Sequence, residues 1–164
     1  MFLLLIPLFF LSCSYKPSIY YQNKLIGEKV NVKVDIDVEN PRESVYLKDA
    51  VIDAIYSSLN KKVCFKDCDT TLIIKPNYSS VQVLDYDENG YPILYRSKVI
   101  LSSVLIDKNG KKRSYVVSGI YDFRIESESI LNDEIKLNAF KNASLNALNK
   151  LFALISKDGV SYDN

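Results

Sequence analysis

Cys13 is the residue whose chemistry and position are most distinctive in this chain of 164 residues. It follows the apolar run 2–11 and Ser12, and polar sequence comes directly after it. At about 1.5 Å per residue, the run would cover only about half of the ~30 Å hydrocarbon core of a bilayer. Such a length is typical of the central region of an export signal that ends at a small residue. The sequence therefore predicts a signal peptide over residues 1–12 and acylation of the Cys13 thiol at the mature N-terminus.

The run also resembles a bacterial lipoprotein signal. The alternatives are a plain secretory signal with an incidental cysteine and a buried N-terminal strand. Each buried methylene of an acylated Cys13 would contribute about 0.8 kcal/mol to membrane attachment, so several chains would hold the protein on a bilayer. Ser14 resembles the sorting position of outer-membrane lipoproteins. Residues 13–28 have the polar composition of a tether between the lipid and a folded domain.

Cys64 and Cys68 are the other two thiols of the chain and are separated by three residues. Three interpretations stay open: a local disulfide that braces a turn, two free thiols, or half of a metal site. Nearby thiols tend to oxidise outside the cytoplasm. A metal would need further ligands, but the chain has no His and no second cysteine pair. We therefore expect no metal and no other cofactor.

The composition offers few groups for catalysis, because the chain contains no His and no Trp. His is the side chain that most often acts as a general base or metal ligand. Asp35 with Asp37, and Asp85 with Asp87, are closely spaced carboxylates, but such acids on strands and turns are usually solvated. No Gly-rich phosphate loop or serine nucleophile motif is present. We therefore expect that the protein is not an enzyme and has no catalytic residues.

Positive charge is modest, since the formal net charge is +1. This balance argues against nucleic acid as a partner, because phosphate binding relies on clustered Lys and Arg. Arg96 and Lys98 are two residues apart on a predicted strand and should project from the same sheet face. Guanidinium and ammonium groups of this kind bind phosphates. Arg96 and Lys98 are therefore candidates for contact with lipid phosphates, and the alternative is an ordinary solvated sheet face.

The first part of the predicted domain contains a strand followed by a helix. Apolar and polar residues alternate over 30–36, which is the pattern of a strand with one buried face. Asn40-Pro41 ends this strand, and Ser44 is predicted to cap a helix. The apolar residues of that helix recur every three or four positions, at Leu47, Val51, Ala54, Ile55 and Leu59.

The second part is predicted to be an antiparallel meander followed by a long helix. Its strands cover 70–84, with an interruption at Pro76, then 93–106 and 114–123, and both connecting turns end in Asn-Gly. The helix runs from Asn132 until Gly159. These elements predict an α+β two-layer sandwich over residues 29–158, with a polar tail over 159–164. Its four-stranded mixed sheet would carry two helices on one face, in the order β-α-β-β-β-α, with the first strand parallel to a neighbour. The other face would carry Tyr95 or its neighbours.

With these elements in place, the chain resembles the lipopolysaccharide-assembly lipoprotein family, LptE, in its epsilonproteobacterial form. The similarity covers essentially the whole mature chain. The residues that carry it lie at the mature start (13–17), on the first helix (44–50), on the hairpin (90–91 and 95–99), on the last strand (117–123) and in the Ala-rich last helix.

The resemblance implies a non-catalytic plug. Family members sit inside the outer-membrane β-barrel LptD, assist its assembly, and contact lipopolysaccharide on its way to the cell surface. By this resemblance, the protein is anchored to the periplasmic side of the outer membrane. The family's basic loop between the second and third strands is acidic here, at 85–90, so Arg96 and Lys98 are the preferred lipopolysaccharide contacts. A different class of function, a lipid-anchored periplasmic module that binds an apolar or envelope ligand, is the alternative.

Overall fold

A computed structural model describes residues 25–35 and 40–160. The elements, in chain order, are β1 (Lys29–Val34), α2 (Pro41–Ala54), the π-helix η1 (Ile55–Leu59), β2 (Lys62–Cys64), β3 (Thr70–Tyr86), β4 (Pro92–Ile106), β5 (Lys112–Arg124) and α3 (Asp133–Val160). Over these residues the strands form a five-stranded sheet in the order β2-β1-β3-β4-β5. Strand β1 is parallel to both β2 and β3, and the other pairs are antiparallel.

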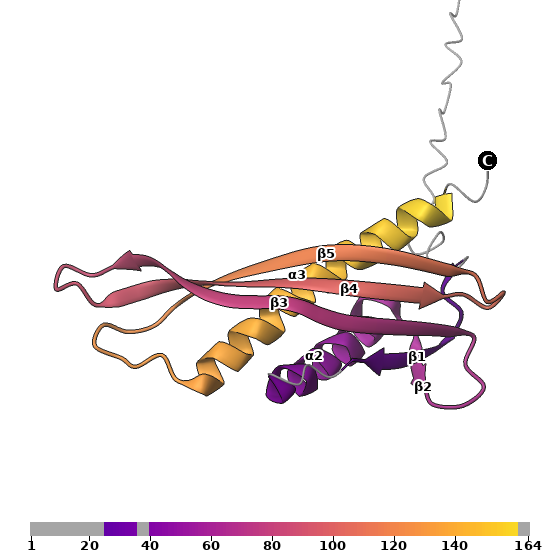
Figure 1. Ribbon diagram of the computed structural model, residues 1–164, viewed down its shortest axis with the longest axis horizontal. Coiled ribbons are helices and arrows are strands. Elements are labelled where there is room, and N and C mark those ends of the chain that lie inside the picture. Colours follow the sequence, from indigo (N-terminus) through magenta and orange to yellow (C-terminus); the bar gives the residue numbers. More distant parts are fainter. Residues whose placement is uncertain (1–24, 36–39, 161–164) are drawn as a thin grey trace, which may run out of the picture.

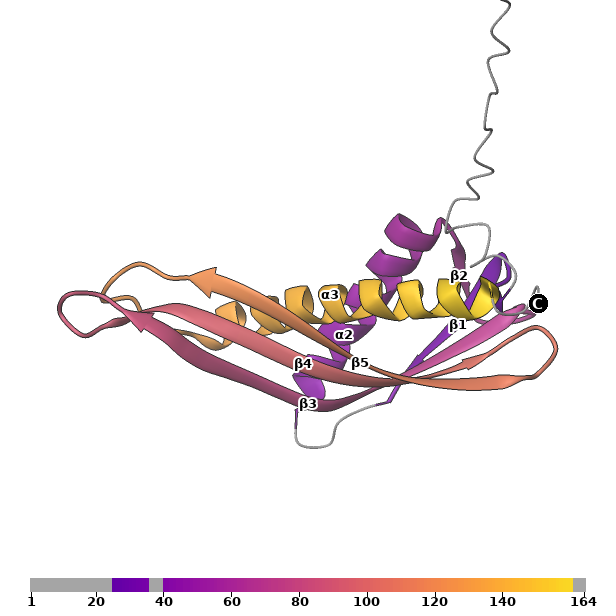
Figure 2. The same ribbon diagram turned by 90° about the horizontal axis from the view of Figure 1, so that it is seen from above.

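The predicted α+β class is confirmed, and Figures 1 and 2 show α2 and α3 packed against the same side of the sheet. The parallel placement of the first strand is also confirmed. The prediction of four strands is wrong, because β2 adds a fifth. With three residues, β2 is too short to show the two-residue period that identifies a strand in a sequence.

Several element boundaries differ from the predictions. Helix α2 begins at Pro41, whose fixed φ suits the first helical turn, so Ser44 is not the cap but a buried residue inside the helix. Leu25 and Ile26, which the sequence placed in the tether, are buried in the core. Gly159 does not stop α3, which continues to Val160.

The core lies between the sheet and the two helices. Many of its largest fully buried side chains come from β3 and β4 on one side and from α2 and α3 on the other: Leu72, Ile74, Leu101, Leu105, Leu47, Leu148, Leu151 and Ile155. Apolar residues at helical spacing meet apolar residues at strand spacing here, so each element contributes one face. This packing is what holds the helices on the sheet.

The backbone of helix α3 lies very close to the sheet at Gly119 of β5. A Cβ atom at this position would lie 1.8 Å from the carbonyl oxygen of Ala143, so only glycine leaves room for the helix backbone. Along the same edge, Asn146 donates a hydrogen bond to the Ile120 carbonyl, and Lys150 donates one to the Ser118 carbonyl, each at 2.8 Å. Because these carbonyls are occupied, α3 protects this part of the β5 edge from pairing with another strand.

Strands β3, β4 and β5 are long and extend beyond the helices, which gives the domain an elongated shape (Figures 1 and 2). Pro76 does not end β3, because a register shift between Pro76 and Tyr78 absorbs the irregularity. At the far end, the Asp87 carboxylate accepts hydrogen bonds from the backbone N–H groups of Asn89 and Tyr91 and from the Ser127 hydroxyl. These bonds lower the pKa of Asp87, the Ser127 bond most strongly, and they hold the hairpin turn together.

Candidate functional site

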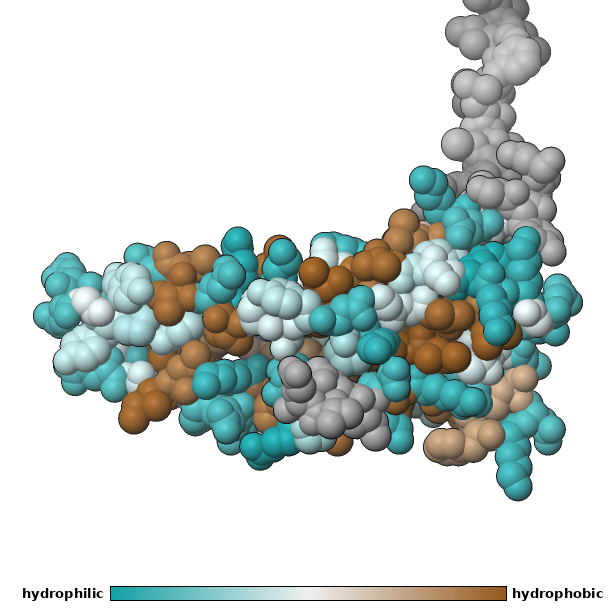
Figure 3. Space-filling model, in the orientation of Figure 1, coloured by the Kyte–Doolittle hydropathy of each residue, from teal (hydrophilic) through white to brown (hydrophobic). Residues whose placement is uncertain are grey.

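The surface of interest is the sheet face that α2 and α3 leave uncovered, which we call the open face. Directly paired residues of neighbouring antiparallel strands point to the same side, so the register identifies its members. They are Ile73, Lys75, Tyr78, Ser80 and Gln82 of β3, Arg96, Lys98, Ile100, Ser102 and Val104 of β4, and Ser114, Val116, Ser118, Ile120 and Asp122 of β5. Figure 3 views the molecule from the side of the open face and shows apolar and polar residues intermixed on it.

Apolar side chains lie in the middle of the open face, although no described element covers them. Val116 is 67% exposed, Tyr78 48% and Ile120 41%. Ile100 lies between Tyr78 and the β5 residues in the register of the three strands. A sheet face that only meets water usually carries polar residues, so this apolar strip marks a surface suited to a binding partner.

Arg96 and Lys98 do lie on one sheet face, as predicted, but their surroundings differ. Arg96 faces Asp122 across the strands, and its Nε and Nη2 donate to the two carboxylate oxygens at 2.7 Å each. This bidentate pair raises the pKa of Arg96 and lowers that of Asp122, in both cases mainly through the hydrogen bonds. Lys98 is exposed and forms no ion pair with a residue in the described part of the chain. Of the two residues, Lys98 is the one whose charge is available to an anionic ligand.

The open face was expected to carry Tyr95 or its neighbours, and the structure places the neighbours there and not Tyr95 itself. It is buried on the helix side, where its ring stacks on Phe123 with ring centroids 5.5 Å apart. The residue next to it, Arg96, is the one that faces outward. Because side chains alternate along a strand, the direction of Tyr95 follows once it is known which sheet face the helices cover. The sequence alone does not show which face that is.

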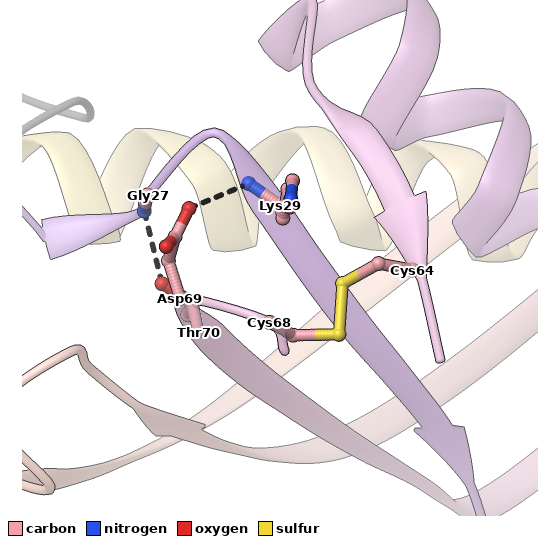
Figure 4. The surroundings of a disulfide bond; sticks show 6 residues. All are labelled: Gly27, Lys29, Cys64, Cys68, Asp69 and Thr70. Atoms are coloured by element: carbon pink, nitrogen blue, oxygen red, sulfur yellow. Dashed lines mark hydrogen bonds between the residues drawn. A yellow bond between two sulfur atoms is a disulfide. The ribbon is translucent and has the colours of Figure 1, made fainter. Parts of the chain in front are cut away.

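Cys64 and Cys68 form a disulfide, so of the three interpretations the structure has the local bridge. Strand β1 lies between β2 and β3, and the bridge passes across it (Figure 4). The adjoining Asp69 and Thr70 accept hydrogen bonds from the backbone N–H groups of Lys29 and Gly27, each at 2.9 Å. The disulfide and these bonds together fasten the segment that leads from β2 to β3 onto β1.

The buried and clustered acids serve structural roles. Burial raises the pKa of Asp107, but hydrogen bonds from Arg113 and from the N–H groups of Lys111 and Asn109 outweigh it, so the pKa is lowered overall. Asp158 accepts a hydrogen bond from Tyr115, whose pKa burial and this bond raise. Over the described ranges there is no group of three residues that would hold a metal ion.

Cys13 and Asp37 lie outside the described residues, so their predicted roles stay predictions. The carboxylates of Asp85 and Asp87 each accept a hydrogen bond from a nearby backbone N–H group, that of Tyr86 and that of Asn89. None of the described helices has both the length and the apolar character that crossing a membrane requires.

Three hollows beside the helices were not predicted from the sequence. One groove, of about 290 Å³, is lined by the starts of α2 and α3, and a neighbouring one, of about 240 Å³, is lined by Val81, Ser97, Leu137 and Phe140. The third hollow is a larger groove that is lined by β1 and α2. Val45 is apolar but lies outside the apolar stripe of α2, and this departure was the sign of the groove in the sequence.

The sequence matches no protein-family model and no curated protein. The fold, however, is similar to solved structures. A protein of Caulobacter crescentus described as a lipoprotein has a TM-score of 0.56 and 10% identity, over 88% of this chain and 98% of that chain. The rare lipoprotein B of Shewanella oneidensis has a TM-score of 0.52 and 11% identity, over 83% of this chain and 99% of that chain.

A protein of Xanthomonas campestris assigned to the family DUF330 is similar to the same extent. Its TM-score is 0.52 with 13% identity, over 85% of this chain and 90% of that chain. Identities this low show the fold and nothing finer. The chain therefore has the fold of these bacterial proteins, two of which are described as lipoproteins.

Proposed function

We propose that this chain is a lipid-anchored envelope protein that acts as plug and assembly partner of an LptD-type barrel in lipopolysaccharide transport. Its acylated Cys13 would hold it on the periplasmic side of the outer membrane. The lipoprotein-like signal, the resemblance to the LptE family and the fold shared with bacterial lipoproteins support this proposal. The protein would catalyse no reaction.

The observation that carries the proposal is the open face. A plug must present a broad, firm surface to the wall that surrounds it, and three long strands paired along most of their length provide one. Its apolar middle, with Val116 and Ile120, is bordered by polar residues such as Lys98 and Asp122. This is the arrangement of a protein interface, with an apolar centre and a polar rim.

The role in lipopolysaccharide contact falls on Lys98 in this proposal, with Arg96 as its neighbour. The Arg96 guanidinium already binds Asp122, so a phosphate would have to compete with a carboxylate for it. Lys98 has no such competitor among the described residues. We expect the Lys98→Glu variant to lose cross-linking to lipopolysaccharide, whereas Lys66→Glu, in the loop between β2 and β3, keeps it.

Purification after mild detergent extraction tests the docking. The full chain should co-purify with a barrel whose mobility changes on heating. The double variant Val116→Asp and Ile120→Asp should reduce the recovered barrel about tenfold, since it places charge in the centre of the interface. Ile130→Asp is the matched control, because Ile130 is 84% exposed and lies in the loop before α3.

The unfolding temperature of each variant shows whether a loss of binding is merely a loss of folding. A well-folded wild-type chain recovered as a monomer without a barrel would contradict the plug function. Depletion of the protein supplies a second readout, because surface lipopolysaccharide should fall and the barrel should fail to mature. Unchanged surface levels with a normal barrel would exclude the proposed role.

A lipid-anchored periplasmic binding module is the second candidate. The grooves at the starts of α2 and α3 favour it, because apolar Leu137 and Phe140 lie there beside the charged Glu43 and Lys136. Their volumes of about 290 and 240 Å³ are small for a drug-sized ligand, so we rank this function second. Lipid that co-purifies with a barrel-free monomer, and is lost in a Phe140→Glu variant, would favour it.

A further inference from the structure

Among the described residues, the outer edge of β1 is covered along only half of its length. Strand β2 pairs with Lys29, Val30 and Asn31 of β1 and ends at Cys64. Strand β1 itself continues to Val34. Beside residues 32–34, on the side away from β3, the described residues include no strand.

The backbone of this uncovered half presents free hydrogen-bonding groups. Successive residues of a strand direct their N–H and C=O groups to opposite neighbours. The Asp35 N–H binds the Ile74 carbonyl of β3 at 2.8 Å, and the Glu28 carbonyl accepts from Lys62 at the start of β2 at 3.0 Å. Even-numbered residues of β1 therefore face the β2 side. The parallel pairing of Asn31 with Cys64 places the Val32 N–H on the Cys64 carbonyl. The Val32 C=O and both main-chain groups of Val34 lie beyond the end of β2 and point away from the sheet.

A groove lies next to these groups. It has a volume of about 810 Å³ and is lined by both β1 and α2. Its apolar lining comes from Val32, Val34, Pro41, Val45 and Ile52. Val45 is 60% exposed, whereas the other apolar side chains of α2 mostly face the core. Unpaired main-chain groups beside an apolar groove suit an extended strand, because a helix has no free main-chain groups to offer along its side.

The charges around the groove restrict the occupant further. Lys33 and Lys48 are exposed, line the groove, and form no ion pair with another described residue. Asp49 lines the groove as well, and Asp35 lies 4.0 Å from Lys75, so two positive side chains of the lining stand against one carboxylate. The groove therefore carries unbalanced positive charge, which an acidic side chain on the occupant would neutralise.

We propose that the groove between α2 and the uncovered half of β1 is a strand-addition site for an extended partner segment that carries alternating apolar side chains and acidic ones. Such a segment would continue the row occupied by β2 and accept and donate hydrogen bonds at Val32 and Val34. Its apolar side chains would pack against Val45 and Ile52, while Lys33 and Lys48 bind its acids. The site lies at the outer edge of β1, apart from the apolar middle of the open face, and does not depend on the barrel function.

A peptide titration followed by NMR tests this inference on the isotopically labelled full chain. The probe is a short acetylated and amidated peptide in which Val alternates with Glu and Thr. Binding should shift the amide signals of residues 32–34. At about 90% saturation it should slow hydrogen exchange of the Val34 amide about tenfold, because exchange then requires the peptide to leave. The Lys33 amide, which faces β3, should change little.

Two control peptides separate strand addition from simple apolar binding. A version with N-methyl groups on alternate residues lacks the main-chain donors, and a version with Lys in place of Glu has the wrong charge. Each should bind at least about tenfold more weakly. Equal affinity of the N-methylated peptide, or signal changes confined to another part of the molecule, would overturn the inference.

Two variants test the protein side. Val34→Pro removes an N–H group that faces outward, and proline is tolerated on strand edges, so β1 should still pair with β3. Lys48→Glu reverses a charge on the exposed side of α2 and should weaken the acidic peptide about tenfold while leaving the fold intact. Lys66→Glu is its matched control. Unchanged affinity of a folded Lys48→Glu variant would contradict the proposed charge preference even if Val34→Pro fails to fold.

Discussion

The two faces of the sheet are built from alternate residues of the same strands, yet they have different tasks. On the covered face Leu101 and Leu105 are completely buried, because α3 and α2 pack against them. On the open face Val116 and Ile120 are apolar and still exposed. The difference teaches that apolar residues on a strand do not by themselves identify the core, and that those on the open face are free to bind a partner.

Two ion pairs between Arg and Asp residues show the same contrast. Arg113 and Asp107 lie 2.8 Å apart at the β4–β5 turn, with the Asp107 side chain only 4% exposed. Arg96 and Asp122 lie 2.7 Å apart on the open face and are both substantially exposed. Water and salt screen an exposed pair, so the buried pair should matter more for stability.

The largest effect is expected where helix and sheet lie very close together. Gly119→Ala would place a methyl group 1.8 Å from the Ala143 carbonyl oxygen and should reduce the free energy of unfolding by about 3 kcal/mol or more, because backbone must move. Urea denaturation measures this change. Ser118→Ala, one residue along on the open face, is the control and should stay within about 0.5 kcal/mol of the wild type. Equal stabilities would show that α3 does not pack as described.

The second test compares the faces directly. Leu101→Ala leaves a cavity in the core and should cost about 3 kcal/mol, whereas Val116→Ala on the open face should change the free energy of unfolding by about 0.5 kcal/mol or less. Both are measured by chemical denaturation of the full chain. If Val116→Ala proved as harmful as Leu101→Ala, the open face would have to be covered within the same chain.

Removal of the disulfide should have the next largest effect. The double variant Cys64→Ser and Cys68→Ser should lose about 2 kcal/mol, the value expected for a bridge that closes a short loop. Thermal unfolding with and without a reductant measures it, and the reductant should lower the unfolding temperature of the wild type alone. If the reductant left the unfolding temperature of the wild type unchanged, packing against β1 would hold the segment between β2 and β3 in place without the disulfide.

The two ion pairs should give the smallest effects, with the buried pair ahead. Asp107→Asn should cost about 1.5 kcal/mol, because Arg113 loses its charged acceptor, and Asp122→Asn should cost less. The lowered pKa of Asp107 means that its contribution is complete above the unfolded pKa near 3.8 and is lost as the pH falls below that value.

Asp107→Asn should therefore flatten the acid side of a plot of stability against pH, and added salt should affect Asp122→Asn less than it affects the wild type. A wild-type curve that is already flat between pH values of about 5 and 3 would contradict the role of Asp107. A larger loss for Asp122→Asn than for Asp107→Asn would reverse the ranking of the two pairs.

Much of the fold follows from local sequence patterns. The alternation in β1, the Asn-Gly turns before Tyr91 and Lys111, and the Ala-rich face of α3 each depend on near neighbours in the chain, so they could be predicted. Strand β2 could not, because its three residues are held by pairing with β1 rather than by their own preference. The same holds for the start of the domain at Leu25, since its burial in the core cannot be read from the polar sequence around it.

The candidate sites were predictable to a smaller degree. The spacing of Arg96 and Lys98 fixed their common face, but Asp122, which binds Arg96, comes from another strand and follows only from the register of β4 and β5. The groove beside β1 is formed where β2 ends and α2 passes, and no single segment encodes it. Sites made by several elements depend on how those elements meet.

The sequence by itself determined the export signal pattern ending at Cys13, the absence of histidine chemistry, the class of the fold and the two-residue alternation of its strands. These properties are local, because they depend on composition and on spacing along one segment. Only the tertiary structure decided which strand face the helices cover, that Arg96 pairs with Asp122, and that no described strand lies along half of the outer edge of β1. Those outcomes depend on which surfaces exclude water together, and that is settled by the packing of the whole chain.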